Sequence, residues 1–224
     1  MLVFKDVCFE YENQPVFNNL NLKIDRGEFI FLIGKSGVGK TTFLQMIYMD
    51  RFPQSGYVQF GNFSSETIQP KEIPILRRKV GVIFQDFKLL KDRNVYDNLA
   101  FVLQVTGAPR KLIKKRIMNA LTDVGLSHKQ KNMPDELSGG EQQRIVIARA
   151  IINSPSLIIA DEPTGNLDPE TSLEILEILQ KINRRGTSVI FATHNYELVK
   201  SVNARIIKLA DGKAVQVILK KKST

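Results

Sequence analysis

A glycine-rich segment at residues 34–41 constrains the fold of this chain more than any other feature. It reads Gly-Lys-Ser-Gly-Val-Gly-Lys-Thr and stands between an apolar strand pattern at 29–33 and a helical pattern that begins near Lys40. Glycines let the backbone N–H groups of such a loop turn inward around a phosphate, and the following helix adds the positive end of its dipole. The segment therefore predicts an α/β fold with a nucleotide bound where a central strand ends.

The positions of this phosphate loop have expected roles. Lys40 is expected to reach the β- and γ-phosphates of the nucleotide, and the Thr41 hydroxyl is expected to bind Mg²⁺. The other positions that we expect to contact the nucleotide are Gly34, Ser36, Gly37, Val38, Gly39 and Thr42.

Two acidic residues follow another apolar strand pattern. Asp161 and Glu162 come directly after residues 157–160, and α/β sheets bind their ligands at this end of their strands. We expect Asp161 to hold Mg²⁺ through water and Glu162 to polarise the attacking water as a general base. Capping of a helix is the alternative role for these acids.

Strand and helix patterns alternate along the chain, which indicates an α/β fold with a largely parallel sheet. Short apolar runs typical of strands covered on both faces lie at 29–33, 80–84, 157–160 and 188–192. Paired strands are expected at 3–9 and 16–24 around a turn at 12–15, and at 205–210 and 213–219 around Asp211-Gly212. Between 85 and 153 the pattern is helical, and one apolar face comprises Ile113, Ile117, Ala120, Leu121 and Val124.

The net charge of +9 is unevenly placed, because residues 109–131 and 200–224 each carry seven basic residues and one acidic residue. Such charge favours an anionic membrane surface or nucleic acid as a neighbour. The alternative is a solvated surface with a disordered tail at Lys220–Lys222.

The sequence gives little support to a secreted or membrane-spanning protein. The single cysteine, Cys8, excludes an internal disulfide. The apolar runs are far below the ~20 residues that span a bilayer, and the first residues follow a strand alternation and not a secretory signal. We therefore expect a cytoplasmic protein.

A second glycine turn, Leu137-Ser138-Gly139-Gly140-Glu141-Gln142-Gln143, opens a helix far from the phosphate loop. Together the two motifs resemble those of the ATP-binding cassette (ABC) ATPases, from about residue 2 to about residue 213. The resemblance implies ATP as substrate and a P-loop core with a parallel sheet, an N-terminal antiparallel β subdomain and an inserted helical subdomain. The nucleotide-binding core would comprise 1–85 and 156–219, the helical signature subdomain 86–155, and the basic tail 220–224.

The same resemblance implies further site residues. Gln85 matches the glutamine that contacts Mg²⁺ and water, His194 the histidine that bonds the γ-phosphate, and Tyr11 the aromatic residue that stacks on adenine. In the family two subunits form an ATP-dependent homodimer, head to tail, and each signature segment caps the ATP of the other. The positions that match this contact are Ser138, Gly139, Gly140 and Gln142. Asp168 matches the D-loop of that interface, and it also has the pattern of a helix N-cap, followed by Pro169.

Segments 73–86 and 160–168 resemble the family branch that serves lipoprotein release, macrolide efflux and cell division. Segment 87–98 is similar to the cell-division ATPases of that branch. This likeness implies an integral membrane partner at the cytoplasmic face of the plasma membrane, moved by ATP-driven closure of the dimer so that it regulates cell-wall hydrolases outside. Residues 87–105 would form much of the docking surface, although several of their side chains could instead pack the subdomain. The expected apolar anchors are Phe87, Leu89, Leu90, Tyr96 and Phe101.

Two other functions fit parts of the pattern. An ATPase for export or lipoprotein release would share the catalytic residues and differ in its partner. A nucleic-acid ATPase of the chromosome-maintenance type would need long coiled coils, and the chain has no sustained heptad run, so no nucleic acid is expected. One departure from the family lies at Tyr48-Met49-Asp50, where a glycine-containing segment is common, and this places the local turn in question.

Overall fold

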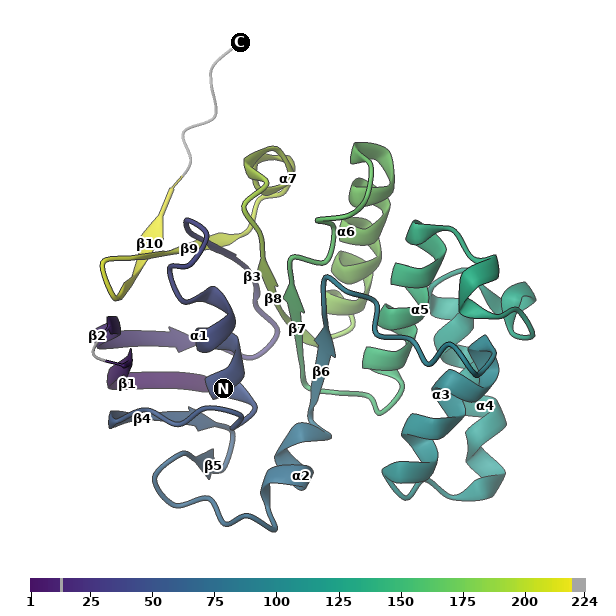
Figure 1. Ribbon diagram of the computed structural model, residues 1–224, viewed down its shortest axis with the longest axis horizontal. Helices are drawn as coiled ribbons and strands as arrows, with labels where there is room; N and C mark the ends of the chain where they lie inside the picture. The colour runs from purple at the N-terminus through teal and green to yellow at the C-terminus, as the bar shows by residue number, and fades with distance from the viewer. Residues whose placement is uncertain (13, 219–224) are drawn as a thin grey trace.

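Two β-sheets organise the chain (Figure 1). The structure is a computed structural model that describes residues 1–12 and 14–218. The larger sheet has the strand order β10-β9-β3-β8-β7-β6, and the smaller sheet has the order β2-β1-β4-β5. The strands are β1 (Leu2–Tyr11), β2 (Gln14–Ile24), β3 (Phe29–Ile33), β4 (Ser55–Phe60), β5 (Phe63–Ser64), β6 (Val80–Ile83), β7 (Leu157–Asp161), β8 (Ser188–Ala192), β9 (Arg205–Ala210) and β10 (Lys213–Val217).

Helices fill the connections between these strands. The α-helices are α1 (Lys40–Ile47), α2 (Ile73–Arg77), α3 (Val95–Val105), α4 (Arg110–Asp123), α5 (Gly139–Ile151), α6 (Pro169–Asn183) and α7 (Tyr196–Ser201). Two 3₁₀ turns, η1 (Ser127–Lys129) and η2 (Pro134–Glu136), precede α5. No described helix is both long and apolar enough to cross a membrane.

The expected parallel sheet is confirmed. Strands β9, β3, β8, β7 and β6 pair in parallel, and β10 pairs with β9 in the antiparallel sense. The expected bounds at 29–33, 188–192 and 205–210 hold, β6 ends one residue early and β7 extends to Asp161. The end of the expected last strand, Leu219, and the basic tail at 220–224 lie outside the described residues.

The first hairpin is tighter than predicted. Tyr11 pairs with Gln14, so the expected turn at 12–15 is too long. Glu12 adopts a positive φ of 43°, which allows the chain to reverse within a short connection. Pro15 can lie in β2 because β2 is an edge strand of its sheet.

The large sheet is buried on both faces, and its side chains alternate between two apolar clusters. Ile30 and Leu32 of β3 pack with α1 and the smaller sheet, whereas Phe31 and Ile33 pack with the helical side of the molecule. Helices α3, α4 and α5 gather at one end of the molecule (Figure 1). The apolar face expected on α4 is confirmed, because four of its members are buried and Ile113 packs beside them.

The Tyr48-Met49-Asp50 segment retains a regular helix end without glycine. The Met49 amide donates to the Met46 carbonyl at 3.3 Å, and the Asp50 amide donates to the Gln45 carbonyl at 3.0 Å. These bonds form the Schellman pattern that usually places glycine in the left-handed conformation. Here Met49 adopts it, with a φ of 55°, and its side chain is buried.

Burial of the Met49 side chain outweighs the strain of its backbone. Glycine would relieve about 1 kcal/mol of left-handed strain, but loss of a buried methionine side chain costs roughly 2–5 kcal/mol. We therefore expect Met49→Gly to lower the free energy of unfolding by about 2 kcal/mol in urea denaturation. Glu12→Gly is the matched control: this residue is exposed with a similar φ, so stability should rise slightly. A Met49→Gly protein as stable as wild type would contradict the prediction.

Candidate functional site

The phosphate loop occupies the connection between β3 and α1, as predicted. Gly37 and Gly39 have positive φ values of 77° and 100°, and Gly39 is the N-cap of α1. A Cβ on Gly39 would lie 2.5 Å from Cγ1 of Val16. The loop is therefore restricted to glycine here for two reasons, its conformation and the close approach of β2. This cradle of backbone N–H groups at a helix N-terminus fits a phosphate group.

Lys40 turns back over this loop. Its Nζ donates to the carbonyl of Gly34 at 3.0 Å and lies 3.5 Å from Oε1 of Glu162. The side chain is almost fully buried, so its charge acts at short range in a poorly hydrated space. Lys40 therefore occupies the position expected of a phosphate ligand at the loop.

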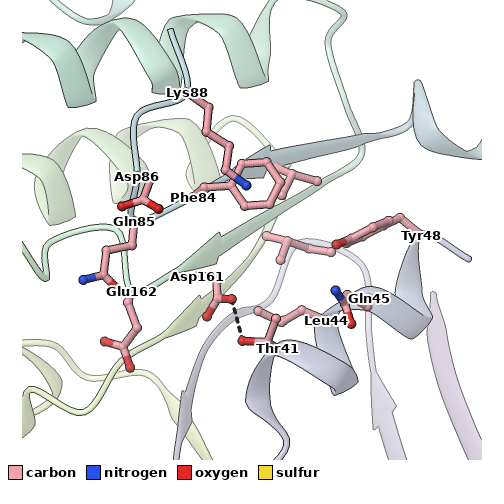
Figure 2. Close-up of a pocket in the computed structure, with 12 residues that line it drawn as sticks. Thr41, Leu44, Gln45, Tyr48, Phe84, Gln85, Asp86, Lys88, Asp161 and Glu162 are labelled. Atoms are coloured by element: carbon pink, nitrogen blue, oxygen red, sulfur yellow. Dashed lines mark hydrogen bonds between the residues drawn. The ribbon is translucent and has the colours of Figure 1, made fainter. Parts of the chain in front are cut away.

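Asp161 lies at the end of β7, opposite the start of α1 (Figure 2). The Thr41 hydroxyl donates to Oδ2 of Asp161 at 2.9 Å. Burial raises the pKa of Asp161, and the Thr41 hydrogen bond opposes that shift. A hydroxyl and a carboxylate side by side are oxygen donors of the kind that Mg²⁺ prefers, so this pair fits the expected metal.

Glu162, directly after β7, contacts both the phosphate loop and the segment after β8. Its Oε2 lies 3.0 Å from Nδ1 of His194 and accepts from the His194 amide at 3.3 Å, while its Oε1 faces Lys40. The backbone of Glu162 has a φ of 48°, which is uncommon for residues other than glycine and asparagine. His194 follows β8 and is mostly exposed. Glu162 therefore reaches the phosphate loop through Lys40, and His194 reaches Glu162 from the neighbouring strand.

Gln85 lines a cavity of about 300 Å³ with Thr41, Asp161 and Glu162. Figure 2 shows these side chains around one space between α1 and the segment after β6. The Gln85 side-chain amide donates to Oδ1 of Asn166 at 3.3 Å. Asn166 is a partner that the sequence motif did not reveal, because the motif gives order along the chain and not contacts across it.

Tyr11 lies beside the same loop. Its hydroxyl is 3.3 Å from Oγ1 of Thr42, and its ring is partly exposed with the Arg51 guanidinium 5.9 Å from the centroid. The structure therefore brings the expected adenine-stacking residue to the first turn of α1.

The signature segment is separate from this site. Ser138 caps α5: its Oγ accepts from the Glu141 amide at 3.2 Å, and the Glu141 carboxylate accepts from the Ser138 amide at 3.0 Å. These contacts form a capping box. None of Ser138, Gly139, Gly140 and Gln142 lines the two described cavities that the phosphate loop lines.

The two glycines of this segment differ in their surroundings. A Cβ on Gly140 would lie 2.5 Å from Cγ2 of Thr171, so any other residue would displace Thr171 where α5 packs on α6. Gly139 is more open, with Leu167 and Phe87 as its neighbours. Asp168 caps α6 by accepting from the Thr171 amide at 2.9 Å, and its hydrogen bonds to Thr171 lower its pKa. The N-cap expected at Asp168 is confirmed.

The expected docking anchors fall into three groups. Phe87, Leu89 and Tyr96 pack against the helical core. Leu90 is half-buried, and Asn98 bonds both its amide and its carbonyl. Phe101 is exposed. Packing of the subdomain therefore accounts for Phe87, Leu89 and Tyr96, and Phe101 alone has the exposure of a surface anchor.

One residue of this region has no counterpart in the sequence predictions. Arg149 of α5 donates from Nη1 to the Lys88 carbonyl at 2.6 Å and from Nη2 to the Phe87 carbonyl at 2.9 Å. Its only signal in the sequence is a charge within a mostly apolar stretch of helix at 145–152.

Residues 17–165 match the ABC transporter family. The chain is similar to the cell division ATP-binding protein FtsE of Bacillus subtilis (strain 168), with 48% identity over 95% of this chain and 93% of the relative. It is 45% identical to FtsE of Mycobacterium tuberculosis, over 96% and 95% of the two chains. For FtsE of Escherichia coli (strain K12) the identity is 42%, over 95% and 96%.

Solved structures give the same likeness. The fold is similar to a dimeric bacterial ABC transporter cassette, with a TM-score of 0.83, 33% identity and 96% of each chain covered. It is also similar to a dimeric ATP-binding cassette in a post-hydrolysis state bound to ADP and Pi, with a TM-score of 0.84 and 32% identity over 99% and 100% of the two chains.

Proposed function

Because the chain belongs to the ABC transporter family and is one of its ATPases, we propose that it drives an integral membrane partner in cell division. The observation that carries the ATP-hydrolysing part of this proposal is the Glu162 carboxylate. It lies between the Lys40 ammonium and the His194 ring at the end of β7, where the water that attacks a γ-phosphate would stand. The relatives named above are cell-division ATP-binding proteins, which supports the cellular role.

Each side chain has a part in the proposed hydrolysis. Lys40 and the loop amides bind the β- and γ-phosphates of ATP, and Glu162 accepts the proton of the attacking water. His194 bonds the γ-phosphate and holds the Glu162 carboxylate in place. Gln85 orients the same water, and Tyr11 stacks on adenine.

Mg²⁺ would be held by Thr41, by Asp161 through water and by Gln85. The ion would neutralise charge that develops on the phosphate oxygens. Within the described residues, histidine, cysteine and acidic side chains form no metal-holding group of three. This is consistent with an ion whose remaining ligands are phosphate and water.

The signature segment acts on a second copy of the chain in this proposal. Ser138, Gly139 and Gly140 begin α5, so their hydroxyl and amides provide an anion site at a helix N-terminus. Two subunits facing head to tail would place this site, with Gln142, over the ATP of the partner copy. Asp168 would stand at the same interface.

The membrane partner, FtsX-like in this proposal, would dock on a groove between α2, β6, α3 and α5. The groove has a volume of about 460 Å³ and is lined by Pro74, Val102, Val105 and Arg149 among others. Val105 and Ile75 are exposed beside it at 65% and 49%, and Phe101 lies on the same helix as Val105. ATP-driven closure of the dimer would then move the partner and regulate cell-wall hydrolases outside, with the protein held at the cytoplasmic face.

Replacing the proposed general base should separate binding from hydrolysis. We expect Glu162→Gln to bind ATP with affinity close to wild type and to lose at least about 100-fold in turnover. Steady-state phosphate release and an ATP titration would measure the two properties. Turnover within about threefold of wild type would exclude Glu162 as the base.

The proposed dimer depends on ATP and on Ser138. In the Glu162→Gln background, ATP should convert a monomer into a dimer in light scattering, because two bound ATP molecules supply much of the interface. Ser138→Arg in that background should abolish the dimer and retain ATP binding, since an arginine side chain would fill the half-site. One unchanged mass in every condition would contradict the proposal.

Docking is tested at the exposed rim of the groove. Val105→Asp should reduce co-purification with the membrane partner at least tenfold, because a buried charge is costly at an apolar contact, and ATP affinity should not change. Val215→Asp is the matched control, because this valine is also exposed but lies on β10. Equal co-purification of both variants would move the docking site elsewhere.

A further inference from the structure

Helix α5 holds the segment after Gln85 through a single arginine. The Arg149 guanidinium donates to two successive carbonyls, those of Phe87 and Lys88, at 2.9 and 2.6 Å. Burial lowers the pKa of Arg149, and no charged partner contributes to that shift. A half-buried guanidinium that is bound to backbone oxygens fixes the path of a chain, because its donor fork is rigid.

The segment that Arg149 holds is itself bent. Lys88 adopts a positive φ of 48°, a conformation that persists only where the surroundings impose it. Its ammonium lies 4.1 Å from the centroid of the Phe84 ring, and Figure 2 shows the Lys88 side chain beside that ring. Phe84 and Lys88 therefore fold toward each other around Gln85.

The same segment contacts the other end of α5. Cζ of Phe87 lies 3.8 Å from the place of a Cβ on Gly139, and Cδ2 of Leu167 lies 3.5 Å from it. Gln85 bonds Asn166, the neighbour of Leu167. Ser138 and Arg149 are 11 residues apart along the helix, about 16 Å. The segment after Gln85 thus touches α5 near both ends.

We propose that Arg149 is a positioning residue that couples Gln85 to the signature segment, so that the two move as one unit when ATP is bound. This inference rests on the proposed function, in which Gln85 contacts the Mg²⁺ and the attacking water at the ATP of its own subunit and Ser138 caps the ATP of the partner copy. Arg149 touches neither nucleotide. It links the position of Gln85 to the position of the signature segment through α5.

The proposal is tested with Arg149→Met, which removes both donors, and Arg149→Lys, which keeps the charge and one donor group. We expect Arg149→Met to lower kcat at least tenfold, with KM and the ATP dissociation constant within threefold of wild type. In the Glu162→Gln background it should weaken ATP-driven dimerisation at least tenfold. Arg149→Lys should restore part of both losses. Thermal unfolding with and without ATP identifies folded variants.

Arg77→Met is the matched control. Arg77 also donates to two successive carbonyls, those of Tyr48 and Met49, at 3.0 and 3.1 Å, but these carbonyls follow α1 and not Gln85. Its kcat and dimerisation should stay within threefold of wild type.

Two results would overturn the inference. One is a kcat within threefold of wild type in both Arg149 variants. If the methionine variant does not fold, the corresponding result is a lysine variant with kcat within threefold of wild type and no loss of dimerisation. The other is a folded Arg149 variant that loses ATP binding together with turnover, because Arg149 would then support the whole site. Failure of the proposed function would be distinct, since Ser138→Arg and Glu162→Gln would then also leave turnover intact.

Discussion

Burial of both faces of a parallel sheet is the constraint on which the rest of this structure depends. Ile30 and Leu32 of β3 lie in one apolar cluster, and Phe31 and Ile33 lie in the other. Because both faces of this central strand are covered by apolar side chains, a polar site cannot form on either face. Parallel pairing aligns the carboxyl ends of β3, β8, β7 and β6 at one edge. Each of those four strands leads into a part of the site: the phosphate loop, His194, Gln85, or the two acids, of which Asp161 is the last residue of β7. Residues up to 160 positions apart therefore converge there.

Backbone strain near this edge is found at residues that other groups hold in place. Glu162 and Lys88 both adopt left-handed conformations, each at a cost of about 1 kcal/mol or more. Glu162 is held by Lys40 and His194, and Lys88 by Arg149 and the Phe84 ring. Met49 adopts the same conformation at the end of α1, but there a buried side chain offsets the strain. Polar contacts therefore hold the strained backbone at the first two positions, and packing holds it at the third.

The sequence predicted those parts of the fold in which local pattern and tertiary burial agree. The runs at 29–33 and 188–192 are wholly apolar apart from Ser188, and polar turns bound them, so their limits were correct. Strand β4, with Ser55, Gly56 and Gln59 among its six residues, was not predicted individually because its partner β1 decides it. The site residues were found through motif order. The contact between Gln85 and Asn166 and the role of Arg149 were not found, since these partners lie 61 to 81 residues apart and backbone oxygens leave no trace in sequence.

The start of α5 gives a physical reason for a second subunit. The Ser138 hydroxyl already accepts from Glu141, and the Gln142 amide donates to the Ser138 carbonyl at 2.8 Å. Within the part of the chain that the structure describes, the amides of Gly139 and Gly140 are left without such an acceptor. Helix N-termini with unpaired amides favour anions, yet the cavities at the phosphate loop exclude this segment. In the proposed function, the phosphate that satisfies these amides belongs to the ATP of a second copy of the chain. Because Arg149 of α5 also holds the segment after Gln85, such a phosphate would act on the helix that positions Gln85 at the subunit's own nucleotide. Each subunit's site would then depend on the occupancy of the other.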